Sequence, residues 1–298
     1  MTYKPIQLTA EQFARYHTDG FLILEQFLPQ DLTQSLVQRM EPLFRGEFET
    51  SIYPDEWHWR PQLSRNDVTR EMCNAWKSDL TIASLALSAE IGRLAASLSG
   101  WSGARMGQDS MWVKPPGARE IAMHQDGVYV DYIDPPQMIT CWIALDDATV
   151  ADGTLIYAKG SHQWELVNPE LEFHAPSQDF RLDMLKAAAQ AGVSDPELVA
   201  VEIPAGGCAF HHGRTWHALG KTTRRDRYFH SIGLHLIPAA ASFHPVNKPG
   251  YIYGRYKRVG SLEMDENFFP ILWTTDGYRT PFLQNYCQDA LNEYAVAP

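Results

Sequence analysis

The 298-residue sequence contains only four cysteines, and no two of them form a CxxC or CxxxC pair. They stand far apart, at Cys73, Cys141, Cys208 and Cys287. This spacing argues against a structural zinc site and against a disulfide framework. We therefore expect reduced thiols and a cytoplasmic protein.

The chain also lacks an excess of basic residues and a long apolar run. Lys and Arg number 25 against 36 Asp and Glu, which gives a net charge of −11 and argues against a nucleic-acid groove. The first residues show no basic segment followed by an apolar one, and no stretch approaches the roughly 18 apolar residues of a membrane span. With 45% hydrophobic residues, the chain has ample material for a large core, and we expect neither nucleic acid nor membrane as a partner.

Helical periodicity dominates the first 104 residues. Thr9 and Gln12 form a capping-box pair for a helix that stops at Gly20. The apolar patterns that follow predict a strand over 21–24 and helices over about 31–44 and 80–98.

From residue 105 the pattern changes to short runs of β-branched and aromatic residues, separated by Pro and Gly turns. These runs predict one antiparallel β unit over 105–238, formed by 105–160 and 199–238. The polar segment of about 163–198, with a helix near 180–191, is predicted as an insertion in this core. The C-terminal extension, 239–298, has no clear period, and we expect a single domain over 1–298.

The tripeptide His124-Gln125-Asp126 is the first candidate for chemistry. It follows the run Lys114-Pro115-Pro116-Gly117 and a short predicted strand. Side chains two residues apart on a strand project from one face, so His124 and Asp126 can offer a nitrogen and an oxygen to one metal ion.

A third ligand has to come from another strand, and the run FHHGRTWH supplies candidates. His211, His212 and His217 are all possible ligands on the residues alone. Two histidines and one carboxylate suit non-haem Fe(II), because they leave other metal positions open, but a zinc hydrolase would accept the same set. Arg227 opens the next apolar strand and could pair with a dicarboxylate that chelates the metal by its other end.

Taken in order, these motifs resemble a known family. The runs KPPG, HQD, DDATVADGTL, KGSH and FHHGRTWH, with an arginine downstream, are similar to the phytanoyl-CoA dioxygenase-like branch of the Fe(II)/2-oxoglutarate-dependent oxygenases. The N-terminal run YHTDGFLIL belongs to the same pattern, so the resemblance spans roughly residues 10 to 238.

The resemblance implies a mainly β fold, a double-stranded β-helix (jelly roll) with flanking helices. It implies Fe(II), 2-oxoglutarate and O₂ as cofactor and cosubstrates, and it selects His217 as the third ligand beside His124 and Asp126. Arg227 matches the arginine that anchors 2-oxoglutarate, with Arg224 and Arg225 as close competitors. Further side chains around the cosubstrate would be those of Trp142, Gln125, Gln108 and Thr140.

One position departs from the pattern. Leu219 stands where many relatives have Ser or Thr two residues after the last histidine, so one hydrogen bond to the cosubstrate is missing.

Aromatic residues near these motifs are candidates for the substrate site. Tyr129 and Tyr132 follow the HQD motif, and Trp57 belongs to the aromatic stretch of residues 53–61, which suggests a lid or a substrate wall. Each could equally be a packing residue.

The expected reaction is oxidation of an unactivated C–H bond in a small organic substrate, with metabolism of natural products as one setting. Asp126 favours hydroxylation, or desaturation, cyclisation or epimerisation, over halogenation, because related halogenases have a small residue there. The alternative is a cupin-like, metal-containing binding or sensor protein without oxygenase turnover. Nothing in the sequence indicates an oligomeric state.

Overall fold

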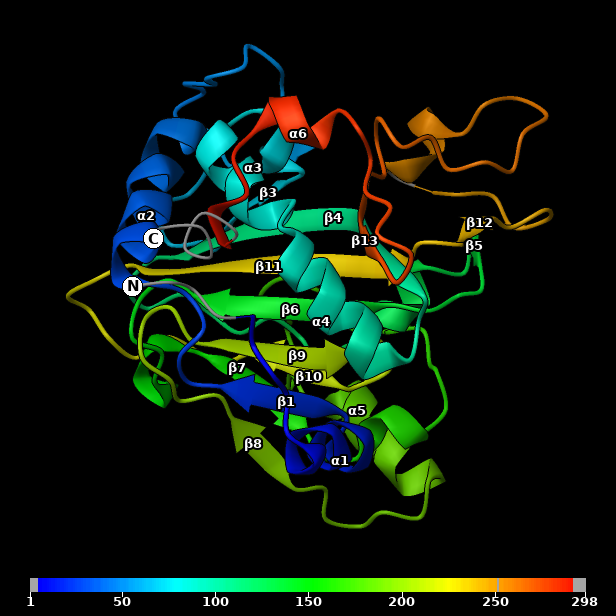
Figure 1. Ribbon diagram of the computed structural model, residues 1–298. Coiled ribbons are helices and arrows are strands. Elements are labelled where there is room, and N and C mark those ends of the chain that lie inside the picture. The colour runs from blue at the N-terminus through cyan, green and yellow to red at the C-terminus, as the bar shows by residue number, and fades with distance from the viewer. Residues whose placement is uncertain (1–4, 251, 292–298) are drawn as a thin grey trace.

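Two antiparallel sheets face each other in the computed structural model, which describes residues 5–250 and 252–291 (Figure 1). The larger sheet has the strand order β1 (Phe21–Leu24), β9 (Cys208–His212), β6 (Ile139–Ala144), β11 (Phe229–Pro238), β4 (Gly103–Lys114), β3 (Arg70–Cys73), β2 (Glu56–Trp57), and β13 (Ile271–Thr274) also pairs with β4. The smaller sheet contains β10 (His217–Leu219), β7 (Leu155–Ala158) and β8 (Leu198–Ala200). This arrangement confirms the predicted jelly roll.

Helices cover the outer face of the larger sheet. Figure 1 shows α4 (Ala89–Ser99) crossing that face, with α2 (Gln30–Phe44) and α3 (Leu80–Ala86) beside it. Their apolar faces and the sheet share one core, so this side of the sheet is closed to solvent. The remaining helices are α1 (Ala10–Asp19), α5 (Leu182–Gln190) and the short α6 (Leu283–Tyr286).

The first predicted helix is confirmed as α1. Thr9 caps it with both hydrogen bonds of the capping box, and Gly20 ends it in the left-handed conformation with φ of 85°.

The helix predicted over 80–98 is in fact two helices, because a second cap interrupts it. The Ser88 hydroxyl accepts a hydrogen bond from the backbone N–H of Glu90 and starts α4 directly after α3. By length and a mean hydropathy of 1.2, the stretch Leu80–Ser99 could cross a membrane, although 67% of it is buried inside the fold, as in a core helix pair.

The flanking segments contribute strands as well as helices. The N-terminal part adds β1, β2 and β3 to the larger sheet, and the C-terminal extension adds β13 and the short β12 (Ser242–Phe243), which pairs with β5 (Ile133–Asp134). The larger sheet therefore extends beyond the predicted core of residues 105–238 and includes strands from both flanking segments. Strands from the flanking segments give the core strands the backbone partners that a sheet requires.

A second core lies between the two sheets and supports the functional site. It includes Trp142 and Phe229 from the larger sheet and Leu155, Tyr157 and Leu219 from the smaller one. These apolar side chains pack the two sheets together, and the polar side chains of the functional site project from the same strands and the loops beside them.

The turn before β7, which contains Gly153, packs closely against the turn after β10, which contains Gly220. Gly153 has φ of +73°, and a Cβ atom there would lie 2.4 Å from the carbonyl oxygen of Gly220. We expect Gly153→Ala to lower the free energy of unfolding by at least about 2 kcal/mol, measured by urea denaturation, because the backbone must move to admit the methyl group.

Gly192 provides the matched control. Its φ is +77°, but a Cβ atom there would meet no atom within 4 Å beyond its own chain neighbours. Gly192→Ala should therefore cost only the left-handed conformation, about 1 kcal/mol. Equal losses for the two variants would show that the contact with Gly220 is unimportant.

Candidate metal centre and active site

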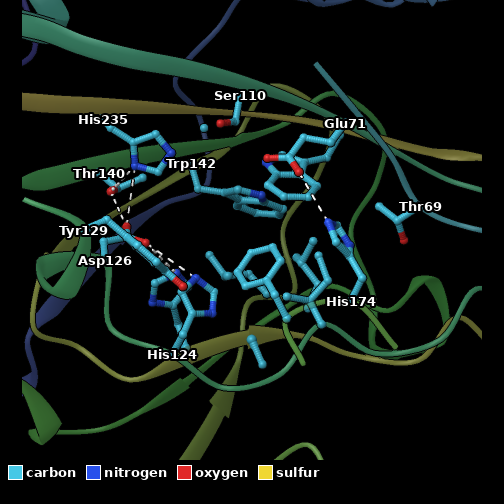
Figure 2. Close-up of a pocket in the computed structure, with 18 of the residues that line it drawn as sticks. Thr69, Glu71, Ser110, His124, Asp126, Tyr129, Thr140, Trp142, His174 and His235 are labelled. Atoms are coloured by element: carbon cyan, nitrogen blue, oxygen red, sulfur yellow. Dashed lines mark hydrogen bonds and ion pairs between the residues drawn. The ribbon is translucent and has the colours of Figure 1, made fainter. Parts of the chain in front are cut away.

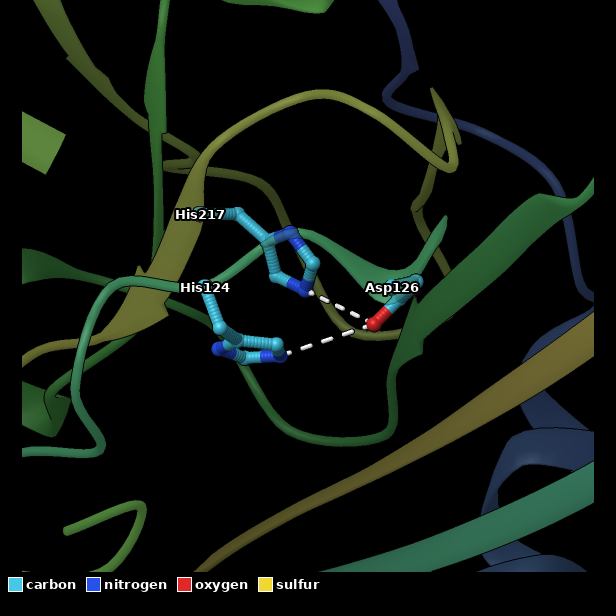
Figure 3. A group of neighbouring side chains, drawn as sticks. All are labelled: His124, Asp126 and His217. Carbon is cyan, nitrogen blue, oxygen red and sulfur yellow. Dashed lines mark ion pairs between the residues drawn. The ribbon is translucent and has the colours of Figure 1, made fainter. Parts of the chain in front are cut away.

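Three buried side chains, those of His124, Asp126 and His217, bring their donor atoms within 4.8 Å of one another (Figure 3). His124 lies in the loop after β4, Asp126 begins a 3-10 turn (Asp126–Tyr129), and His217 begins β10. The backbones of the two histidines pair reciprocally, with both N···O distances at 3.0 Å. This bridge fixes the two rings side by side.

Each imidazole is oriented by its own backbone. Nδ1 of His124 donates to the carbonyl of Ala122, and Nδ1 of His217 donates to the carbonyl of Thr215, both at 2.9 Å. Because the proton is then on Nδ1, the Nε2 lone pair is free to bind a metal. Both Nε2 atoms lie 3.5 Å from Oδ1 of Asp126.

The two oxygens of Asp126 have different roles. Oδ1 faces the ligand histidines, whereas Oδ2 accepts hydrogen bonds from Thr140 Oγ1 at 2.7 Å and from His211 Nε2 at 3.1 Å. The Thr140 hydroxyl is itself contacted by His235, whose Nδ1 lies 3.0 Å from Thr140 Oγ1 (Figure 2). These contacts hold the carboxylate with one oxygen available.

The protonation states suit a divalent cation. Burial acts to raise the pKa of Asp126, but nearby His217 and the close approach of His124, His211 and His235 outweigh it and hold that pKa well below its usual range. Burial, assisted by His124, lowers the pKa of His217 well below its usual value. A carboxylate and neutral imidazoles are the forms that bind metal.

The other two histidines of the FHHGRTWH run are not ligands in this arrangement. His211 uses both ring nitrogens, one on Asp126 and the other on the Tyr157 hydroxyl at 2.8 Å. His212 points elsewhere and accepts the N–H of Arg214 at 3.1 Å, and burial lowers its pKa to about 4. Of the three candidates, only His217 completes the triad.

The triad lies on the wall of a cavity of about 1010 Å³, hereafter the central cavity, between the two sheets. Near the metal ligands its wall is aromatic. The Phe173 ring meets the His124 ring edge-on at 4.8 Å, and Tyr129 lies 6.5 Å from the same ring. Such walls reduce the access of water to the ligands.

The predicted cosubstrate residues are only partly brought together. Trp142, Gln108 and Thr140 line the central cavity. Nε1 of Trp142 is buried and has no hydrogen-bond partner among the described residues, which leaves one donor free for a ligand.

Gln125, in contrast, points away from the triad. Its side-chain amide donates to the carbonyl of Arg214 at 2.7 Å and accepts the N–H of Val167 at 3.0 Å. The prediction that Gln125 binds the cosubstrate is therefore not supported, because alternation along the extended backbone turns it to the opposite side from its two neighbours.

Arg227 does not reach the central cavity. Its guanidinium pairs with the Asp152 carboxylate, at 3.0 Å from Nε and 2.9 Å from Nη2, and also donates to the carbonyl of Asp147. Arg224 pairs with Asp226 near the surface, and Arg225 is exposed. The assignment of a hairpin arginine to 2-oxoglutarate stays a prediction without support from these contacts.

Two of the three predicted substrate residues line the central cavity. They are Tyr129, which is half exposed, and Tyr132, which is buried and stacked on Tyr253 at 4.8 Å. Trp57 is instead a packing residue, 5.2 Å from the Phe48 ring. The next residue, His58, lines the cavity, because neighbouring side chains of the extended segment face opposite sides.

Sequence reasoning missed several wall residues from distant segments. The insertion supplies Phe173 and His174, and β3 supplies Glu71, which forms an ion pair with His174 at 3.4 Å (Figure 2). The C-terminal extension supplies Tyr253. No local motif marks these positions, since only the packing of the insertion and the extension against the barrel brings them to the cavity.

Comparison with known proteins gives a consistent result. The profile of the phytanoyl-CoA dioxygenase (PhyH) family matches residues 16–227. A phytanoyl-CoA dioxygenase of Arabidopsis thaliana is 25% identical over 271 residues, which cover 77% of this chain and 89% of that protein.

Solved structures share the fold. The chain is similar to SnoK, a non-haem α-ketoglutarate-dependent carbocyclase from nogalamycin biosynthesis, with a TM-score of 0.65, 23% identity, and coverage of 89% of this chain and 96% of SnoK. EctD from S. alaskensis, solved with 2-oxoglutarate and 5-hydroxyectoine, has a TM-score of 0.64, 18% identity and coverage of 87% of each chain. Since the profile match covers most of the chain and includes all three triad residues, the protein belongs to the phytanoyl-CoA dioxygenase family.

Proposed function

We propose that the protein is an Fe(II)- and 2-oxoglutarate-dependent oxygenase that oxidises an unactivated C–H bond of a small organic molecule. The observation that carries this proposal is the triad, whose donor atoms converge at the wall of a cavity of about 1010 Å³. Two imidazoles and one carboxylate are the ligand set of non-haem Fe(II) oxygenases.

The residues present fit both the iron and 2-oxoglutarate. His124, Asp126 and His217 would hold the iron, and the unpaired Nε1 donor of Trp142 suits a carboxylate oxygen of the cosubstrate. When bound, iron and 2-oxoglutarate supply the activation of O₂ and the electrons for C–H oxidation.

The protein itself contributes orientation and the exclusion of water. Thr140 and His211 keep one oxygen of Asp126 turned toward the metal position. The aromatic wall of Phe173 and Tyr129 shields the ligand rings and leaves room for an organic substrate of moderate size.

Hydroxylation is the proposed outcome, with ring closure, desaturation or epimerisation as variants. The EctD structure with 5-hydroxyectoine supports the first, and the carbocyclase SnoK supports the second. Asp126 argues against halogenation, since a carboxylate occupies the ligand position that a halide needs. The origin of SnoK in nogalamycin biosynthesis supports the proposal of a setting in natural-product metabolism, and the four free cysteines support a cytoplasmic location.

An anaerobic titration tests the proposal. We expect a weak visible charge-transfer band only after both Fe(II) and 2-oxoglutarate are added to the metal-free protein. His217→Ala should abolish the band, because a ligand is lost, whereas His212→Ala should retain it, because His212 lies outside the triad.

The alternative, a cupin-like binding protein, predicts a different result. Such a protein would hold a metal but would not convert 2-oxoglutarate to succinate in air, with or without a substrate. Absence of the band together with tightly held zinc would contradict the oxygenase proposal and favour the binding protein or a hydrolase.

A further inference from the structure

One part of the central cavity combines a carboxylate with aromatic rings. Glu71 on β3 pairs across the strands with Trp112 on β4, so both side chains project from the same face of the larger sheet and line the cavity. The insertion adds Phe173 and His174, whose rings lie 6.2 Å and 6.1 Å from the Trp112 ring. These four residues are hereafter the Glu71 cluster.

Phe173 connects the Glu71 cluster to the metal ligands, because its ring also meets the His124 ring at 4.8 Å. Figure 2 shows His124 and Asp126 at one end of the drawn residues and Glu71 with His174 at the other. A molecule that fills the cavity can therefore present a C–H bond to the metal position while its far end lies beside Glu71.

The backbone of the insertion is fixed beside the HQD motif. The carbonyl of Phe173 accepts the N–H of Ala122 at 2.9 Å, and the N–H of Ala175 donates to the carbonyl of Glu120 at 3.0 Å. These bonds hold the Phe173 and His174 rings next to Trp112 without a ligand. The aromatic side of the Glu71 cluster is therefore preorganised, which lowers the entropic cost of binding.

Glu71 has no lysine or arginine partner within residues 5–250 and 252–291. Its side chain is 13% exposed, and its ion pair is with His174 at 3.4 Å, which is charged only when protonated. The adjacent Arg70 points to the other face of β3 and pairs with Glu41 at 2.7 Å. A largely buried carboxylate without a permanent counter-ion is costly, and a cationic ligand offsets that cost.

The charge of the rest of the central cavity also favours a cation. Among the described residues, five carboxylates line it against two arginines. Both arginines are engaged elsewhere, since Arg65 pairs with Asp67 and Arg119 donates to the carbonyl of Pro176. A divalent metal, Asp126 and the dianion 2-oxoglutarate together sum to one negative charge, so the loaded centre does not reverse this balance.

We propose that the Glu71 cluster binds a protonated amine of the organic substrate. The Glu71 carboxylate accepts an N–H of the ammonium group, and the rings of Trp112 and Phe173 contact its positive charge and the adjoining methylene groups. The His174 side chain, which is 47% exposed, turns toward solvent when the amine takes its place. This inference rests on the proposed function and narrows its substrate class to amines.

The test uses three probes that share a phenyl ring on a four-carbon chain and differ in the end group. They are 4-phenylbutylamine, 4-phenylbutanol and 5-phenylpentanoate, which are cationic, neutral and anionic at neutral pH. Each is titrated into the protein loaded with Mn(II) and 2-oxoglutarate, and the broadening of its NMR signals by Mn(II) gives the dissociation constant. The readout is the amine preference, that is, the dissociation constant of the alcohol divided by that of the amine.

We expect the wild-type protein to bind the amine about 10-fold more tightly than the alcohol, as for a charge-assisted hydrogen bond at a partly buried site, and to bind the carboxylate more weakly than either. Mn(II) should broaden the phenyl signals more than those of the methylene beside the nitrogen, because Phe173 lies between the triad and the other members of the Glu71 cluster. An amine bound directly to the metal would give the opposite order and contradict the proposal.

Four variants locate the effect. Glu71→Gln keeps the size of the side chain and should remove most of the amine preference, and Trp112→Leu should reduce it by about 3-fold. His174→Gln should keep or raise it, because a competitor for Glu71 is lost. Asp131→Asn is the matched control and should keep the wild-type preference, since Asp131 is an exposed carboxylate of the same cavity outside the Glu71 cluster.

The affinity for 2-oxoglutarate, measured on each variant, shows that the fold and the metal site are intact. An unchanged amine preference in Glu71→Gln, an equal loss in Asp131→Asn, or tighter binding of the carboxylate than of the alcohol would overturn the assignment of Glu71 and leave the oxygenase proposal intact. Failure of the wild-type Mn(II) protein to bind 2-oxoglutarate would instead contradict the proposed function and this inference with it.

Discussion

Asp126→Ala is expected to abolish the conversion of 2-oxoglutarate to succinate. Asp126 is the only anionic donor of the triad, and its Oδ1 lies 3.5 Å from both ligand imidazoles. Without it, two neutral histidines alone must retain a divalent metal, and the affinity for Fe(II) should fall below what a purified protein keeps. Succinate formation and metal content of the purified variant measure the effect.

The matched control is Asp131→Ala. Asp131 also lines the central cavity, but it is exposed and is not part of the triad. The Asp131→Ala variant should therefore retain Fe(II) and should still form succinate in the absence of substrate. Wild-type turnover in Asp126→Ala would remove Asp126 from the ligand set and, with it, the main support for the proposed function.

Thr140→Val is expected to weaken metal binding by about 10- to 100-fold, the usual effect of losing a hydrogen bond to a ligand. The Thr140 hydroxyl donates to Asp126 Oδ2 at 2.7 Å and also meets Nδ1 of His235. Valine has nearly the same shape, so the variant removes this hydroxyl with little change in packing. Titration of the metal-free protein with Mn(II), followed by electron paramagnetic resonance, gives the affinity.

Thr154→Val separates this effect from a general loss of stability. Thr154 is equally buried, and its hydroxyl donates to the carbonyl of Val201 at 2.8 Å, outside the triad. Its replacement should lower the free energy of unfolding by about 1 kcal/mol and leave metal affinity unchanged. Similar metal affinities in the two variants would mean that Thr140 does not support the ligand.

The ligand set was predictable because its signals are local. The HQD tripeptide places two donors on one side of an extended segment, and the FHHGRTWH run places three histidines on another. Spacing alone could not choose among these three. The choice of His217 came from the resemblance, and in the structure the reciprocal backbone pairing of His124 with His217 accounts for it.

The residues around the ligands were harder to predict, because their direction depends on alternation and on partners far away in sequence. Gln125 and Trp57 each lie one residue from a cavity residue, and that single step turns them to the opposite side. Arg227 has the expected residue type at the expected strand start. Its direction is set by Asp152, which is 75 residues away.

The sequence by itself determined the family, the jelly roll with its flanking helices, and the three metal ligands, since each depends on short-range patterns and ordered motifs. Only the tertiary structure decided which histidines support Asp126, which segments wall the central cavity, and where the charged groups lie. Lys114 shows the reason: its sequence context is an ordinary KPPG turn, and only the packing of two sheets buries its ammonium group without a carboxylate partner among the described residues. The energetic cost of a buried charge is set by surroundings that the chain assembles from distant segments.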